Sequence, residues 1–108
     1  MANAKKQTTN IRDTFGDFAP KLVALTEEVL FGDIWEREEL LPRDRSLITV
    51  AALIAGGNAE QLTFHLQRAK ENGLTEIELK ETITHLAFYA GWPKAMSAIT
   101  VAKKVFEK

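Results

Sequence analysis

The chain holds two histidines, the side chains best suited to proton transfer near neutral pH. His65 lies between Leu62 and Leu66, at the edge of an apolar stripe. It fits a general acid or base at the rim of a pocket, and it equally fits a half-buried histidine bonded to backbone or carboxylate. His85 follows Glu81 by four residues, the spacing of an ion pair on a helix surface. One His and one Glu are too few ligands for a metal, so we predict no metal site.

Three charged residues are further candidates. Glu60 could act as a base, although a carboxylate in the first turn of a helix also offsets the helix dipole. Arg43 and Arg45, in "PRDRS", lie where a helix begins and where positive charge is mildly unfavourable. Arginine holds carboxylates with two hydrogen bonds, so both could bind an acidic substrate. Ordinary ion pairs with Asp44 or Glu36 explain the two arginines equally well.

Aromatic residues gather around a tight break in "FYAGWPKAM", where Phe88, Tyr89 and Trp92 lie close together in sequence. They could lock two helices together or form the wall of an apolar pocket. The chain has no glycine-rich phosphate loop, no serine nucleophile elbow and no calcium loop. These three kinds of site are therefore not expected.

Composition restricts the function further. The 108 residues fit one domain, which we expect over residues 12–108, after a flexible arm over residues 1–11. The net charge of −1 gives no field for attracting nucleic acid or an anionic membrane, and no stretch is apolar enough to span a membrane. Without cysteine there is no thiol chemistry and no Cys-based metal site. We expect a protein of the cytoplasm.

Helical periodicity runs through every long segment, and no segment alternates like a strand, so we predict an all-α fold. The expected helices cover about residues 18–31, 43–55, 58–72, 75–90 and 93 to near the end. A connector with at most one short turn follows the first. The second, with "LITVAALIA", is apolar nearly all round, which is typical of a helix buried on most sides.

Caps and inward stripes follow from the same pattern. Asn58 with Gln61, and Thr75 with Glu78, have the spacing of capping boxes. Gly73 is expected just after its helix ends, and Glu76 and Lys80 are spaced to pair. The expected inward residues are Leu22, Leu25, Val29 and Leu30 in the first helix, Leu62, Leu66 and Ala69 in the third, Leu79, Ile83, Leu86 and Ala90 in the fourth, and Ala95, Ala98 and Ala102 in the last.

The stretches "RDRSLITVAAL", "EQLTFHLQRAKENG" and "HLAFYAGWPKA" resemble the carboxymuconolactone decarboxylase family, and the resemblance runs from about Phe15 to Phe106. It implies a small alkylhydroperoxidase D-like fold that assembles as a homotrimer or as a hexamer of trimers. The nearly all-apolar helix over residues 43–55 and the alanine stripe agree with such an assembly, because both offer more apolar surface than a chain of this length easily covers.

Peroxidase relatives of this family carry two cysteines, a histidine and a glutamate. When their histidine is aligned on His65, the cysteine positions fall on Asn58 and Gln61, and the glutamate position falls on Ser46. His65 alone keeps its residue type. The resemblance therefore argues against thiol peroxidase activity here.

The decarboxylase members of the family imply a different chemistry. They convert a carboxylated muconolactone into an enol-lactone with release of CO2, and they need no cofactor because the lactone carbonyl accepts the electrons. By resemblance, His65 would donate the proton and Glu60 would orient it or relay the proton. Arg43 or Arg45 would hold a carboxylate, and N–H groups after Gly57 would stabilise the oxyanion.

Tyr89 and Trp92 would form the wall of the substrate pocket, and His85 stays a second candidate for substrate binding. Three functions remain open at this point: a cofactor-free decarboxylase in aromatic catabolism, a family member that binds or transforms another small acid, and an oligomer without catalysis. The sequence does not name the substrate or the number of subunits.

Overall fold

A computed structural model describes residues 11–107 of the chain, and these residues are helical with no β-strand among them. The all-α fold class is confirmed for them. The chain divides into two compact units, one up to Leu40 and one from Leu41 onward. The predicted arm over residues 1–11 lies outside the described residues except for Ile11, which is helical, as are residues 12–15. The single domain over residues 12–108 stays a prediction.

The first unit is built on one long helix that changes its winding. The α-helix α2 covers Pro20–Leu25 and continues without a break as the π-helix η1, Thr26–Phe31. A single 3₁₀ turn, η2, follows at Ile34–Glu36, which confirms the short turn expected in the connector. Pro20 occupies the first turn of α2, where its missing N–H costs no hydrogen bond.

The stripe predicted for this helix is wrong. Val23 and Phe31 are buried, whereas Leu22, Leu25, Val29 and Leu30 are exposed. Val29 and Leu30 lie in the π-helix, whose hydrogen bonds span one more residue than those of an α-helix, so the α-helical spacing rule no longer predicts their face. Leu22 and Leu25 lie in the α-helical part, and the π-helix does not explain their exposure. The Phe31 ring stacks on Trp35 with 6.3 Å between ring centroids.

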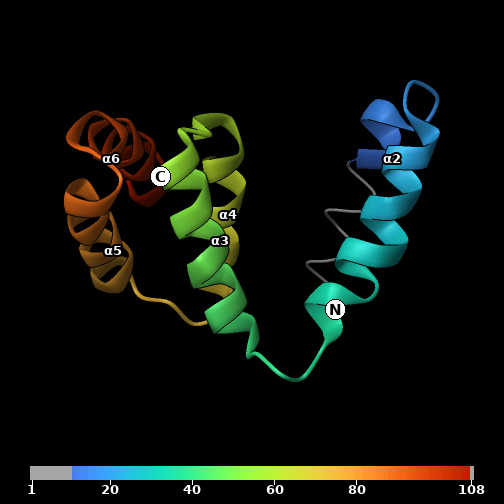
Figure 1. Cartoon of the computed structure of the whole chain (residues 1–108), viewed down its shortest axis with the longest axis horizontal. Helices are drawn as coiled ribbons and strands as arrows, with labels where there is room; N and C mark the ends of the chain where they lie inside the picture. The colour runs from blue at the N-terminus through green and yellow to red at the C-terminus, as the bar shows by residue number, and fades with distance from the viewer. Residues whose placement is uncertain (1–10, 108) are drawn as a thin grey trace. The chain divides into compact units, whose positions relative to one another are not determined.

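The second unit is a bundle of four helices, shown in green to red in Figure 1. Their bounds are Pro42–Gly56 for α3, Ala59–Glu71 for α4, Glu76–Tyr89 for α5 and Trp92–Phe106 for α6. Helix α3 contacts all three others, α4 contacts α6, and α5 lies against α6. The predicted bounds that were given by number each differ from these bounds by one residue.

The core of the second unit joins all four helices. Its buried members are Val50, Ile54, Leu62, Leu66, Ala69, Leu74, Leu79, Ile83, Ala95, Ala98, Ala102 and Val105. The stripes predicted on α4 and α6 are confirmed, and on α5 Leu79 and Ile83 are buried while Leu86 packs against the core. Helix α3 is more one-sided than expected, because it buries Ser46, Val50 and Ile54 and exposes 55% of Ile48.

The two predicted capping boxes have different outcomes. At α5 the box is present: the Glu78 N–H donates to Thr75 Oγ1, and the Thr75 N–H donates to Glu78 Oε1 at 2.9 Å. At α4, Asn58 occupies the N-cap position, but its side chain makes no cap hydrogen bond. The Asn58–Gln61 box is therefore wrong. Gly57, at the end of α3, has a φ of 72°, and Gly73 has a φ of 106°, which explains a glycine at each turn.

Candidate active site

His65 lies in the middle of α4 and is half-buried. Burial and, to a smaller extent, the positive charge of Arg68 lower the pKa of its imidazole from 6.5 to about 4. At neutral pH the imidazole is therefore uncharged. An uncharged imidazole can accept a proton through one ring nitrogen and donate a hydrogen bond through the other.

Arg68 follows His65 by one helical turn and is 1% exposed. Its Nε and Nη1 atoms are buried, and so are Nδ1 of His65 and Nε of Arg45. A buried guanidinium is rare, because removing a full charge from water is costly unless other groups compensate for it. Sequence reasoning missed Arg68. Its place three residues after His65, beside the Leu62–Leu66–Ala69 stripe, was a signal that could have found it.

A hydrogen bond connects α3 to the C-terminal end of α4, and its two residues lie close in sequence to Arg45 and Arg68. Asn72 Nδ2 donates to Ser46 Oγ at 2.9 Å, and the Ser46 side chain is fully buried. Asn72 is the C-cap residue of α4, and Ser46 lies in the first turns of α3 directly after Arg45. The bond therefore holds the α3 segment that bears Arg45 against the last turn of the helix that bears His65.

Glu60 lies in the first turn of α4, where its carboxylate faces solvent and complements the helix dipole. The backbone N–H groups expected to stabilise an oxyanion are partly committed. The Asn58 N–H, the first of the groups after Gly57, donates to the Leu53 carbonyl at 2.9 Å. This donor is therefore engaged in ending α3, which corrects the expectation for it.

The ion-pair partners of Arg43 are residues other than His65. Its guanidinium pairs with Glu78 of α5 and approaches Asp44 at 3.5 Å. The Thr75 N–H lowers the pKa of Glu78, and Arg43 adds to the effect, so this carboxylate keeps its charge well into the acidic range. The expected pairing of Arg43 with Asp44 is present, and the carboxylate of Glu78 is an additional partner.

Arg43 and His85 line the same groove, which has a volume of about 460 Å³ and lies between α3 and α5. Leucine and alanine side chains form most of its floor, and Glu78 and Glu81 also line it. Together, Arg43 and the two glutamates give the lining of the groove a net formal charge of −1. Such a groove disfavours an anionic substrate.

The aromatic candidates lie beyond this groove. Tyr89 is 80% exposed and stacks on His85 with 4.8 Å between ring centroids. No ion pair joins Glu81 to His85 among the described residues, and this stack is the contact that His85 makes instead. Trp92 meets Phe88 edge-on and lines a smaller groove of about 160 Å³ between α5 and α6.

The structure therefore places the candidates from the sequence at separate sites. His65 shares α4 with Glu60 and is close to the charge of Arg68, Arg43 and His85 share the α3–α5 groove, and Trp92 lines another groove. The profile of the carboxymuconolactone decarboxylase family matches residues 20–104, which is most of the chain. The chain belongs to this family.

Two decarboxylases are among the similar proteins. The 4-carboxymuconolactone decarboxylase of Acinetobacter baylyi is 34% identical over 103 residues, which cover 95% of this chain and 77% of that protein. The nitrosuccinic acid decarboxylase npaB of Metarhizium robertsii is 35% identical over 80 residues, 74% of this chain and 56% of that protein. An uncharacterized 15.0 kDa protein of Paracoccus denitrificans is 33% identical over 81% of this chain and 66% of its own length.

The chain therefore spans about three quarters of the first relative and little more than half of the second. Within residues 11–107, no three His, Asp or Glu side chains are placed to hold a metal ion together. In the same part of the chain, no helix has the length and apolarity needed to cross a membrane.

Proposed function

We propose that this member of the carboxymuconolactone decarboxylase family is a cofactor-free decarboxylase of a small carboxylated acid. One observation carries the proposal: an uncharged, half-buried imidazole lies beside a buried arginine on the same helix. Such a pair combines a group that can move a proton with a fixed positive charge for an anion. The two decarboxylases among the relatives support this reaction type.

The substrate class follows from the two substrates that the relatives' names give. Carboxymuconolactone and nitrosuccinic acid both carry carboxylates and an electron-withdrawing group, a lactone carbonyl in one and a nitro group in the other. When the bond to the leaving carboxylate breaks, CO2 departs and the electron pair moves into that acceptor group. A proton added to carbon completes the reaction. We expect this chain to act on an acid of the same type.

In this mechanism Arg68 stabilises the negative charge that moves from the leaving carboxylate to the acceptor oxygens, and His65 delivers the proton. The free imidazole is uncharged at neutral pH, because burial and Arg68 both oppose its protonation. An anion bound near Arg68 would offset the second effect and raise the proton affinity of His65. Substrate binding and protonation of His65 would then favour each other.

The other candidates have secondary roles in the proposal. Arg45 is the better candidate for a second carboxylate contact, because Arg43 is already held by Glu78 and Asp44. Glu60 would act on His65 through water or through another subunit, since it lies in the exposed first turn of α4. Tyr89, Trp92 and His85 as substrate-binding residues, the trimeric or hexameric assembly, a place in aromatic catabolism and a cytoplasmic location stay predictions.

The test is CO2 release from 4-carboxymuconolactone and from nitrosuccinate by the purified protein. The variants are His65→Asn, Arg68→Lys and Arg68→Met, and Gln67→Asn is the control because Gln67 is an exposed residue of the same helix. Loss of a positioned acid–base group typically costs a factor of about 100 or more in turnover. We therefore expect a loss of this size for His65→Asn and full activity for Gln67→Asn.

Two results would contradict the proposal. If the wild-type protein releases no CO2 from either substrate, it does not decarboxylate these acids, and a binding or structural role is favoured. CO2 release that is unchanged in His65→Asn would show that His65 is not the proton donor. Because Arg68 is buried, circular dichroism and thermal unfolding of both Arg68 variants must accompany the assay, and Arg68→Lys keeps the charge when Arg68→Met does not fold.

A further inference from the structure

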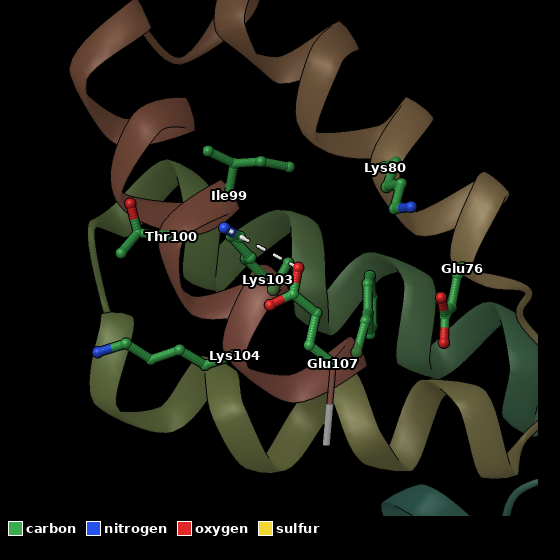
Figure 2. A pocket seen from close by; sticks show the side chains of 9 residues that line it. Glu76, Lys80, Ile99, Thr100, Lys103, Lys104 and Glu107 are labelled. Carbon is green, nitrogen blue, oxygen red and sulfur yellow. Dashed lines mark ion pairs between the residues drawn. The ribbon is translucent and has the colours of Figure 1, made fainter.

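A groove near the C-terminal end of α6 lies away from the residues assigned to decarboxylation. It has a volume of about 620 Å³ and is lined by α5, α6 and Glu107. Figure 2 shows that Lys80 comes from α5 and that Lys103 and Lys104 come from α6, so basic side chains stand on two of its helices. We call it the basic groove, defined by these three lysines and by Ile99, Ala102 and Phe106.

The floor of the basic groove is apolar. Ala102 is 1% exposed and belongs to the core of the second unit, and Ile99 and Phe106 are half-buried and pack against that core. The ammonium of Lys70 lies over the Phe106 ring, 5.3 Å from its centroid. The groove therefore offers a firm apolar surface, including one aromatic ring, with positive charge around it.

Within residues 11–107, the acidic residues of the groove pair with only one of its three lysines. Glu76 is bound by Lys70 at 2.6 Å, which replaces the pair with Lys80 expected from sequence. Glu107 lies 3.9 Å from Lys103, the pair drawn as a dashed line in Figure 2. Among residues 11–107, neither Lys80 nor Lys104 has an acidic partner. Three lysines against two glutamates leave a formal charge of +1 in the lining.

The helix dipole explains part of this charge and leaves part unexplained. Lys103 is in the last turn of α6, with Lys104, where a positive charge compensates for the helix dipole. Lys80 is not at a helix C-terminus, because it lies in the second turn of α5. Its unpaired ammonium beside an apolar floor points to an anionic group with an apolar body.

We propose that the basic groove binds a small amphipathic carboxylate, with its carboxylate at Lys80 and its apolar or aromatic body on Ile99, Ala102 and Phe106. The volume lies within the range of about 300 to 1,000 Å³ typical of small-molecule sites. The site uses none of the residues proposed for decarboxylation, so the two proposals stand or fall separately. The ligand is bound here without being changed.

The test follows the backbone and methyl resonances of the isotope-labelled protein during titration with 3-phenylpropionate. We expect saturable shifts at Ile99, Ala102 and Phe106, with a dissociation constant of about 1 to 10 mM for a ligand of this size. The neutral analogue 3-phenylpropan-1-ol has the same body without the charge. It should bind about fivefold more weakly, because exposed ion pairs each contribute a factor of a few.

Lys80→Gln should weaken 3-phenylpropionate by the same factor and leave the alcohol unchanged. Lys21→Gln is the matched control, because Lys21 is an exposed lysine of α2 in the first unit. Equal affinity for acid and alcohol, shifts that cluster elsewhere, or no saturation would overturn the proposal. So would sedimentation showing that Lys80→Gln dissociates an oligomer, since a second copy would then occupy the groove.

Discussion

Arg68 lies one helical turn after His65 on α4, and its charge adds to burial in lowering the pKa of the imidazole to about 4. The two side chains are thus coupled electrostatically before any substrate arrives. A buried cation beside a neutral base is costly for folding, since both groups have lost water. Arrangements of this kind are common where a protein performs proton transfer.

The first prediction concerns this coupling. Replacing Arg68 with Gln should raise the pKa of His65, although not to 6.5, because burial is the larger cause of the shift. Proton NMR of the imidazole ring during a pH titration measures the change, and His85→Asn assigns the two histidine signals. Arg37→Gln, at an exposed arginine of the first unit, is the control and should leave the His65 titration unchanged. An unchanged titration in Arg68→Gln would show that the charge is not felt at His65.

The second prediction concerns stability and pH. Between pH 6.5 and 4 the unfolded chain holds a proton on His65 that the folded protein does not, so the free energy of unfolding falls as the pH falls through this window. After allowance for partial exposure to solvent, we expect a loss of about 1 to 2 kcal/mol. Urea unfolding at a series of pH values measures it.

His65→Gln should flatten the pH dependence of stability in this window. The carboxylate of Glu78 has a lowered pKa and so contributes its own loss of stability at lower pH, as it becomes protonated below its usual value of 4.5. An equally steep decline between pH 6.5 and 5 in His65→Gln would assign the effect to other groups.

The third prediction compares how much the N-cap residues of α4 and α5 stabilise the protein. Thr75→Ala should destabilise the protein by about 1 kcal/mol, because it removes the capping box of α5. Asn58→Ala should cost less, because the Asn58 side chain makes no cap hydrogen bond at the start of α4. Thermal or chemical unfolding of the two variants beside wild type gives the comparison. A larger loss for Asn58→Ala than for Thr75→Ala would mean that Asn58 caps α4 in solution.

The fourth prediction concerns the hydrogen bond between α3 and α4. Asn72→Ala leaves the buried hydroxyl of Ser46 without its amide partner and should cost about 1 to 2 kcal/mol. In the double variant with Ser46→Ala the two losses should not add, and a coupling energy of about 1 kcal/mol is expected. Gln67→Ala, at an exposed position of α4, is the control and should change stability by less than about 0.5 kcal/mol.

Much of the second unit could be predicted from sequence because its signals are local. The stripe Leu62–Leu66–Ala69 and the box Thr75–Glu78 depend on spacings within one helix, and the structure confirms both. The stripe of the first helix was not predicted correctly. For Val29 and Leu30, the π-helix over Thr26–Phe31 changes the spacing on which such a stripe depends, and no residue type in the sequence indicates this winding.

The site was harder to predict than the fold, because it depends on which distant residues meet. Arg43 resembled a carboxylate-binding residue in the sequence, but Glu78, 35 positions away, is its partner. Arg68 was not among the sequence candidates and is buried. Both outcomes depend on tertiary packing, which a single sequence does not display. The assignment of His65, Glu60 and the other site residues stays a prediction.

The π-helix also makes one short segment tolerant of losing a residue. A π-helical stretch holds more residues per turn than an α-helix, so losing one residue between Thr26 and Phe31 would favour ordinary winding. The change of winding compensates for the missing residue, so Phe31 would keep its direction relative to Val23 and its stack on Trp35. A one-codon deletion here should therefore harm the first unit less than a one-codon deletion inside a regular α-helix such as α4.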